Sequence, residues 1–305
     1  MPTAQPMAEP PSRAAAPPLL DLLEPRRALT GVTGFLWRNP TVAIGGAMLI
    51  ALVLMAILAP WLGTVDPTAI APAKRLRAPN ADFWFGTDKL GRDIYSRCLY
   101  GARVSLSVGF AVAAMASIIG LAIGLVSGFI RIADGIIMRI MDGMMSIPPI
   151  LLAVALMALT RGSVANVITA ITLAEIPRVA RLVRGVVLSL REQPYLDAAV
   201  AAGTRTPMLI WRHVLPNTIA PLLVQATYIC ASAMIVESIL SFIGAGTPTY
   251  IPSWGNIMAE ARELWQVKPF LIFFPAIFLS LTVLAVNMVG DGLRDALDPR
   301  QAKSV

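Results

Sequence analysis

Long stretches without a charged residue constrain this chain most strongly. Each is long enough for a helix of about 20 residues, the length that crosses a hydrocarbon core of roughly 30 Å. The stretches are Thr41 to Leu62, Val104 to Ile130, Gly143 to Thr160, Val214 to Val236 and Pro269 to Gly290. A weaker stretch from Gly162 to about Leu188 carries Glu175. Because the alternation of a β-barrel is absent, we expect an all-α, polytopic membrane protein with six transmembrane helices.

Composition supports this class. Of the 305 residues, 56% are hydrophobic and 14% are charged, which excludes an ordinary soluble domain. The net charge of +7 does not indicate nucleic acid, because the arginines serve topology and contact anionic lipid headgroups.

Basic residues in short loops favour the cytoplasmic side, and six spans place both termini there. We expect a flexible cytoplasmic tail over 1–30, then an interfacial helix, the first transmembrane helix and an extracytoplasmic loop over 31–103. A core of five transmembrane helices follows over 104–293, and a cytoplasmic tail over 294–305. Arg178, Arg181 and Arg184 share one face where the fourth span leaves the membrane, so they either continue toward the next polar segment or reach lipid headgroups.

A polar segment over 191–217, here called the hinge segment, separates two apolar blocks. Pro194 suits the first turn of a short helix, and Gly203 suits a left-handed residue that ends it. Thr206 and Pro207 fit the N-cap and first residue of a second helix, which Pro216 should end. The segment therefore predicts a bent helix pair at a membrane surface.

The sequence shows no motif for metal binding, nucleotide binding or catalysis. His213 is the sole histidine, so histidine-based metal clusters are excluded, and no phosphate-cradling G-x-x-x-x-G-K-[ST] segment occurs. No clustered nucleophile and base stand out, which argues against a membrane-embedded enzyme. If ATP drives this protein, another subunit must bind it.

The hinge segment resembles the E-A-A-x-x-x-G loop of ATP-binding-cassette (ABC) importer permeases, with Asp197, Ala198, Ala199 and Gly203 at the motif positions. Asp197 replaces the glutamate of the motif, and His213 takes a position that is isoleucine in the family. Three further segments resemble the C-type subunit of the dipeptide, oligopeptide and nickel permease family: FGTDKLGRDIYSRCLYGARVSLSV from Phe85, ESILSFIGAGTPTYIPSWG from Glu237 and NMVGDGLRDALDPR from Asn287.

This resemblance implies a type I ABC importer permease fold in a bacterial plasma (inner) membrane. It implies a second homologous permease subunit, two ATPase subunits that carry ATP and Mg, and an extracytoplasmic substrate-binding protein, with no cofactor or metal in this chain. The ATPase would dock on Asp197 to Gly203, with Thr206, Met208 and Trp211 as flanking contacts. The loops over 63–103 and 243–268 would meet the binding protein.

Polar side chains within spans are candidates for the translocation path, because such groups are costly against lipid. The candidates are Glu175, Gln225, Tyr228, Ser232 and Glu237. Hydrogen bonds between helices are the alternative for the hydroxyls, and a solvated span end is the alternative for the two carboxylates. Small residues in the second span, Ser117, Gly120, Gly124 and Gly128, indicate close helix packing instead.

Two charged clusters have open alternatives. Charges within Gly86 to Asp93 are expected to pair inside their loop. At the C-terminus we expect either an ion-pair cluster or a solvated tail, over Asp291, Arg294, Asp295, Asp298 and Arg300.

Substrate choice stays open at this stage. Di- or oligopeptides rank first, followed by glutathione-like peptides and then nickel or other metal chelates. A secondary transporter driven by an ion gradient is the rival class, although it would predict inverted repeats that the sequence does not show.

Overall fold

A computed structural model describes residues 32–160 and 162–297. The predicted tail over 1–30 and residues 298–305 lie outside the described residues. A short helix, α1 (Val32–Arg38), occupies the segment where an interfacial helix was expected, and it belongs to a unit separate from the rest of the chain. The unit that begins at Asn39 contains the other described helices.

The described residues form helices without a β-strand. After α2 (Pro40–Leu58) come α3 (Ile94–Phe129), α4 (Arg131–Met145), α5 (Pro149–Ala158), α6 (Val164–Arg191), α7 (Pro194–Ala201), α8 (Thr206–Leu209), α9 (Leu215–Phe242), α10 (Trp254–Ala261) and α11 (Phe270–Leu297). Short 3-10 turns occur at Ala59–Trp61, Pro72–Lys74 and Arg262–Leu264, and a π-helical turn at Ile210–Val214 leads into α9.

The second span starts earlier than the sequence predicted. Helix α3 begins at Ile94 rather than near Val104, because Asp93 caps it by accepting a hydrogen bond from the Ser96 amide at 2.9 Å. Its first turns contain Arg97, which is buried and ion-paired with Asp88 and Glu260, and Arg103, which is exposed but hydrogen-bonded to the end of α2. Arg103 Nε donates to the Ala56 carbonyl at 2.6 Å. A prediction from charge-free stretches therefore missed these ten residues.

The predicted third span, Gly143 to Thr160, is wrong as a single helix. Helices α4 and α5 are long and apolar enough to cross a membrane only when taken together, and they are bent by 87° at the break between them. Pro148 and Pro149 explain the break, because proline lacks an amide donor and disfavours the helical state of the residue before it. The pair forms either a broken span or a re-entrant loop.

Four helical segments are long and apolar enough to cross a membrane, or five if the bent pair counts as one span. The four are Pro40–Trp61, Ile94–Phe129, Thr206–Phe242 and Phe270–Leu297. Helix α6 is long enough but carries Glu175, Arg178, Arg181 and Arg184, so its composition falls short. The predicted six spans are thus supported in four or five cases, and α6 stays a prediction.

Close packing of α3 against α6 organises the core. A Cβ atom added at Gly120, Gly124 or Gly128 would lie 2.5 to 2.6 Å from Val179, Val183 or Val187, closer than real Cβ atoms approach. The small residues thus let the two backbones meet, as the sequence predicted. Helix α3 also packs along α9, and α11 packs along both α9 and α2.

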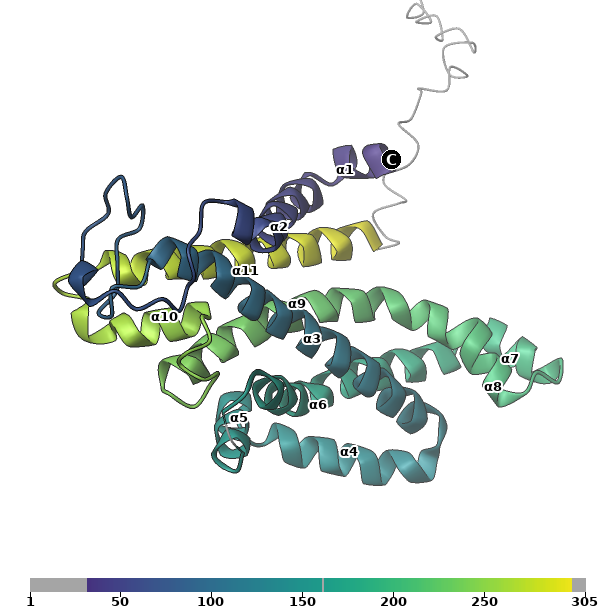
Figure 1. Cartoon of the computed structure of the whole chain (residues 1–305). Helices are drawn as coiled ribbons and strands as arrows, with labels where there is room; N and C mark the ends of the chain where they lie inside the picture. The colour runs from purple at the N-terminus through teal and green to yellow at the C-terminus, as the bar shows by residue number, and fades with distance from the viewer. Residues whose placement is uncertain (1–31, 161, 298–305) are drawn as a thin grey trace, which may run out of the picture. The chain divides into compact units, whose positions relative to one another are not determined.

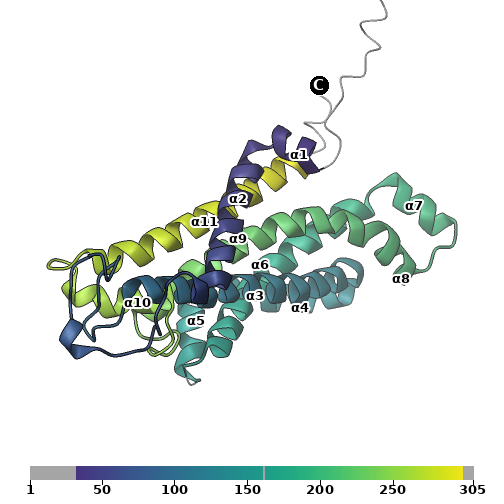
Figure 2. The same cartoon turned by 45° about the horizontal axis from the view of Figure 1, so that its top comes forward.

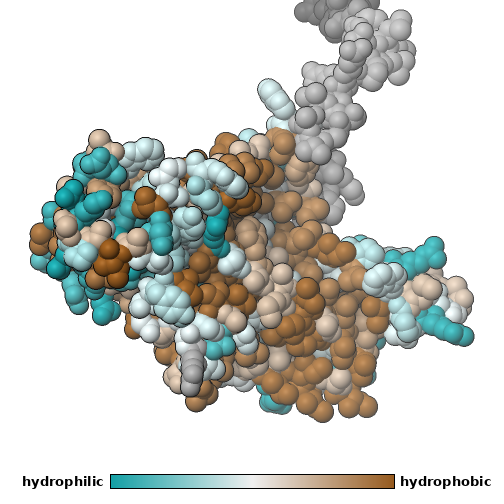
Figure 3. All heavy atoms as spheres, viewed as in Figure 1, coloured by the Kyte–Doolittle hydropathy of each residue, from teal (hydrophilic) through white to brown (hydrophobic). Residues whose placement is uncertain are grey.

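The hinge segment and the long loops lie at opposite ends of the unit (Figures 1 and 2). We call these the hinge end, with α7 and α8, and the loop end, with residues 63–93 and α10. In Figure 3 hydrophobic residues cover the middle, and hydrophilic residues gather at both ends. This distribution matches a protein whose middle faces lipid and whose ends face water.

Candidate functional site

The hinge segment forms the bent helix pair that the sequence predicted. Helix α7 starts with Pro194 in its first turn and ends before Gly203, whose φ is +82°. The Gly203 amide donates to the Val200 carbonyl at 2.9 Å, and the Thr204 amide donates to the Ala199 carbonyl at 3.1 Å. These two bonds form a Schellman motif, which needs the left-handed conformation that glycine adopts without strain.

Two details of the second helix differ from the prediction. Thr206 is the first residue of α8 rather than its cap; Arg205 holds the cap position without a side-chain hydrogen bond. Pro216 does not end the helix, because the π-helical turn widens the backbone before it. The Leu215 amide there donates to the Ile210 carbonyl, five residues back. Such a wide turn relieves the clash between a proline ring and the preceding turn.

Large apolar side chains of the hinge segment are exposed. Leu196 and Leu209 are buried and anchor the pair to the core, whereas Met208 is 55% and Trp211 is 71% exposed. Asp197 and Ala198 are also exposed, and Asp197 lies in the first turn of α7. Tyr195 and Val200 add to the exposed apolar surface. An apolar surface at a polar end of the molecule is typical of a site for another protein.

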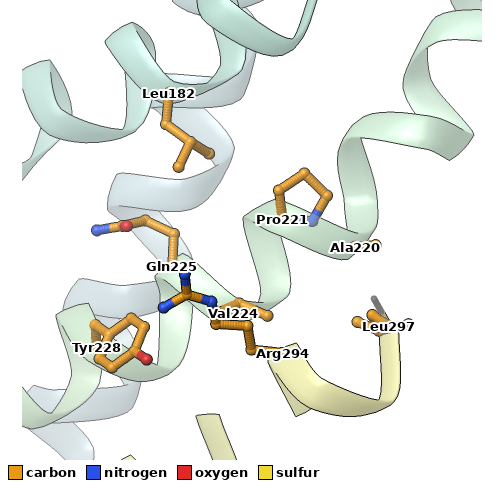
Figure 4. A pocket seen from close by; sticks show the side chains of 8 residues that line it. All are labelled: Leu182, Ala220, Pro221, Val224, Gln225, Tyr228, Arg294 and Leu297. Atoms are coloured by element: carbon orange, nitrogen blue, oxygen red, sulfur yellow. The ribbon is translucent and has the colours of Figure 1, made fainter. Parts of the chain in front are cut away.

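A cavity of about 460 Å³ opens between α6, α9 and α11 (Figure 4). Gln225 and Tyr228, two of the path candidates, line it together with Arg294 of α11. The Tyr228 hydroxyl donates to Asp291 Oδ1 at 2.6 Å, which ties α9 to α11. The cavity lies toward the hinge end, because the α9 residues that line it, between Ala220 and Tyr228, belong to the half of α9 that follows the hinge segment.

The other path candidates lie elsewhere. Glu175 is buried; its Oε1 accepts from Ser232 Oγ at 3.5 Å, and its Oε2 lies 3.3 Å from Arg178 Nη1. Glu237 is fully buried near the loop end, where Ser241 Oγ donates to it at 2.8 Å. The structure therefore places Gln225 and Tyr228 in one cavity and joins Glu175 to Ser232 by a hydrogen bond. Glu237 lies apart from both pairs.

Arginines of α6 face α4. Arg181 pairs with Asp142, and Arg184 Nη2 donates to Asp134 Oδ2 at 2.7 Å. Both interpretations offered for these side chains from the sequence, a continuation toward the hinge segment and contact with lipid headgroups, missed these ion pairs. Asp134 and Asp142 lie 50 and 39 residues away in sequence, so no local spacing indicated them.

A buried cluster of four charges joins two distant segments at the loop end. Arg97 Nη1 donates to Asp88 Oδ2 at 2.7 Å and to Glu260 Oε2 at 2.6 Å. Arg92 pairs with the same two carboxylates. Pairing within the loop was expected for Asp88 and Arg92, but the contribution of Glu260 from α10 had no sequence signal.

Among Asp291, Arg294 and Asp295, the described members of the expected C-terminal cluster, no ion pair forms, and the cluster as a whole stays a prediction. Asp291 bonds to Tyr228 rather than to a basic residue, and Arg294 points into the cavity. Asp298 and Arg300 lie outside the described residues. Arg294 is thus a candidate path residue that sequence reasoning placed in a different role, because only the fold brings α11 beside α9.

Comparison with solved structures defines the class of this fold. Two structures of the MetNI methionine ABC transporter in inward-facing conformations match with TM-scores of 0.54 and 0.55 at 20% sequence identity. The matches cover 67% and 66% of this chain and 98% and 96% of the respective chains. The fold is that of an ABC importer permease.

The chain belongs to the family described as binding-protein-dependent transport system inner membrane component, whose model matches residues 116–303. Residues 35–79 match the N-terminal TM domain of oligopeptide transport permease C. Proteins of this family work in complexes with ATPase and substrate-binding partners, so this chain is a transport subunit rather than an enzyme. Membership also decides against the ion-gradient alternative.

Curated relatives match over most of their length. The probable peptide ABC transporter permease protein y4tQ of Sinorhizobium fredii is 50% identical over 266 residues, 87% of this chain and 91% of the relative. The dipeptide transport system permease protein DppC of Alkalihalophilus pseudofirmus is 41% identical, covering 86% of this chain and 87% of the relative. The oligopeptide permease OppC of Bacillus subtilis is 37% identical, covering 87% of each chain.

Proposed function

We propose that this chain is one of two different permease subunits of an ATP-driven, binding-protein-dependent importer of di- or oligopeptides in a bacterial inner membrane. The observation that carries the proposal is the bent helix pair α7–α8, which presents exposed apolar side chains at a polar end of a membrane protein. The names of the relatives support peptides as the substrate class.

The hinge segment would receive movement from the ATPase. Asp197, Ala198, Ala199 and Gly203 would enter a groove of that subunit, since alanines allow close approach and the Schellman motif holds the pair at a fixed angle. Thr206, Met208 and Trp211 would flank the contact. Closure of the ATPases on ATP and Mg would then tilt α6 and α9, which leave the two ends of the hinge segment.

The hinge end would lie in the cytoplasm with both termini, and the loop end would face the binding protein. The translocation path would form between this subunit and its homologous partner, with Glu175, Gln225, Tyr228, Ser232 and Glu237 as the candidate polar groups. Membrane lipid would surround the apolar middle.

Uptake by the complete complex tests the proposal. The complex in proteoliposomes, with its binding protein, is expected to accumulate a radiolabelled dipeptide only when ATP reaches the ATPase side. Glutathione and a nickel chelate serve as competing substrates, and a preference for either would replace peptides as the cargo. Uptake driven by an ion gradient without ATP would refute the ATP-driven mechanism.

A further inference from the structure

The cavity between α6, α9 and α11 has an uneven lining. Leu182, Pro221, Val224 and Leu297 make apolar walls, whereas Gln225, Tyr228 and Arg294 form a polar patch (Figure 4). Apolar walls accept many shapes, and a few converging polar groups fix the orientation of a ligand. The chemistry of the patch therefore indicates what the cavity holds.

Arg294 supplies the positive charge in the polar patch of the cavity. It points from α11 toward Gln225 and lies beside Tyr228 in Figure 4. The nearby carboxylate of Asp291 accepts the Tyr228 hydroxyl proton at 2.6 Å. Within the described part of the chain, no carboxylate forms an ion pair with Arg294. Its guanidinium interacts with the Tyr228 hydroxyl, which leaves its other N–H groups to face the cavity. A guanidinium is always charged, and its planar set of donors matches the two oxygens of a carboxylate.

The neighbours of Arg294 complement an amide. The side chain of Gln225 both donates and accepts hydrogen bonds, as a peptide group does. The Tyr228 hydroxyl donates a hydrogen bond to Asp291, and its oxygen faces the Arg294 guanidinium, so Tyr228 helps to position Arg294 beside Gln225. A carboxylate close to an amide occurs at the C-terminus of every unblocked peptide, whatever its side chains.

We propose that this cavity is a transient site for the C-terminal carboxylate of a passing peptide, which Arg294 holds while Gln225 bonds the last amide. The inference rests on the proposed peptide importer and adds how the permease itself recognises its cargo. The site binds weakly, since cargo that enters must also leave. Apolar walls on the other side accept different side chains.

Comparison of one peptide in two forms tests the site. The complete complex in proteoliposomes takes up radiolabelled trialanine or its C-terminal amide, with the wild-type subunit or with R294Q. The measured quantity is the ratio of acid uptake to amide uptake. The binding protein is the same in the wild-type and R294Q complexes, so its own preference for acid or amide cancels when the two ratios are compared. R139Q is the matched control, since Arg139 is an exposed arginine of α4 outside the cavity.

R294Q is expected to lower the acid-to-amide ratio about tenfold, which corresponds to about 1.4 kcal/mol. R294K keeps the charge without the paired donors, so its ratio should fall between those of R294Q and the wild type. ATP hydrolysis stimulated by the binding protein should persist in both, as should the wild-type ratio in R139Q.

Several outcomes overturn the site. An unchanged acid-to-amide ratio in R294Q does so, whether uptake stays at the wild-type level or both forms lose uptake equally. An equal loss is what a lipid headgroup on Arg294 or a purely structural role would produce. If R294Q does not assemble, R294K decides alone, and a wild-type ratio in R294K rejects the site. Failure of the wild-type complex to import either form would instead reject the peptide-importer function.

Discussion

At the scale of single residues, charge pairing across long sequence distances holds the loop end together. The side chain of Arg97 is 2% exposed and depends on Asp88 and Glu260 for its charge balance. Removing one partner of a buried ion pair leaves an uncompensated charge, which costs more than the pair contributes. Trp254 is fully buried in the same region, and its indole nitrogen donates to the Cys98 carbonyl at 3.0 Å. Glu260 therefore links α10 to the start of α3.

Glu260→Gln should lower the free energy of unfolding by about 3 kcal/mol, because Arg92 and Arg97 would share only Asp88. Thermal unfolding of the purified complex, followed by tryptophan fluorescence, measures the loss. The matched control is Glu263→Gln, an exposed glutamate one turn further on, which should unfold like the wild type. Equal melting temperatures for both variants would show that the cluster does not stabilise the loop end.

At the scale of elements, the helix pair α7–α8 depends on one left-handed residue. No atom lies within 4 Å of a Cβ added at Gly203, so space does not restrict this position. Its φ of +82° does, because side chains, and β-branched ones most of all, resist that conformation. The angle between α7 and α8 is therefore sensitive to this residue.

Gly203→Val should reduce peptide uptake about tenfold, since strain of 1 to 3 kcal/mol shifts the pair away from its docking angle. The ATPase subunits should still copurify with the variant. Asparagine tolerates the left-handed region, so Gly203→Asn is the control and should transport within about twofold of the wild type. Normal uptake by Gly203→Val would remove the hinge segment from the coupling role.

At the scale of the whole molecule, two polar ends flank an apolar middle (Figure 3). The hinge segment lies at one end and residues 63–93 lie at the other (Figure 1). A protein with this distribution spans the membrane between its ends, so the two ends should face different compartments.

Cysteine labelling in whole cells tests this arrangement. Val65 is 55% and Val200 is 59% exposed, at opposite ends, and the native Cys98 and Cys230 are buried. In cells that lack the ATPase and the binding protein, which would cover these positions, a maleimide that cannot cross membranes should label Val65→Cys in intact cells but Val200→Cys only after permeabilisation. The wild-type protein should stay unlabelled in both conditions. Labelling of Val200→Cys in intact cells would place the hinge end outside and refute the proposed topology.

The sequence alone determined the class of protein, most of the apolar spans and the start and end of α7. These features depend on local signals: charge-free stretches, proline in the first helical turn and glycine at a left-handed position. The four segments that carried the resemblance led to the family that the comparisons then showed. The hinge motif positions could be named in advance for the same reason.

Only the tertiary structure decided which charges and polar groups meet. Arg97 and Glu260 are 163 residues apart, and Tyr228 and Asp291 are 63 apart, so packing of whole helices selects these partners. The same applies to the start of α3, where arginines satisfied by distant groups extend a helix beyond its charge-free stretch. Local propensity cannot encode such pairs, because their energy exists only once the helices have packed against each other.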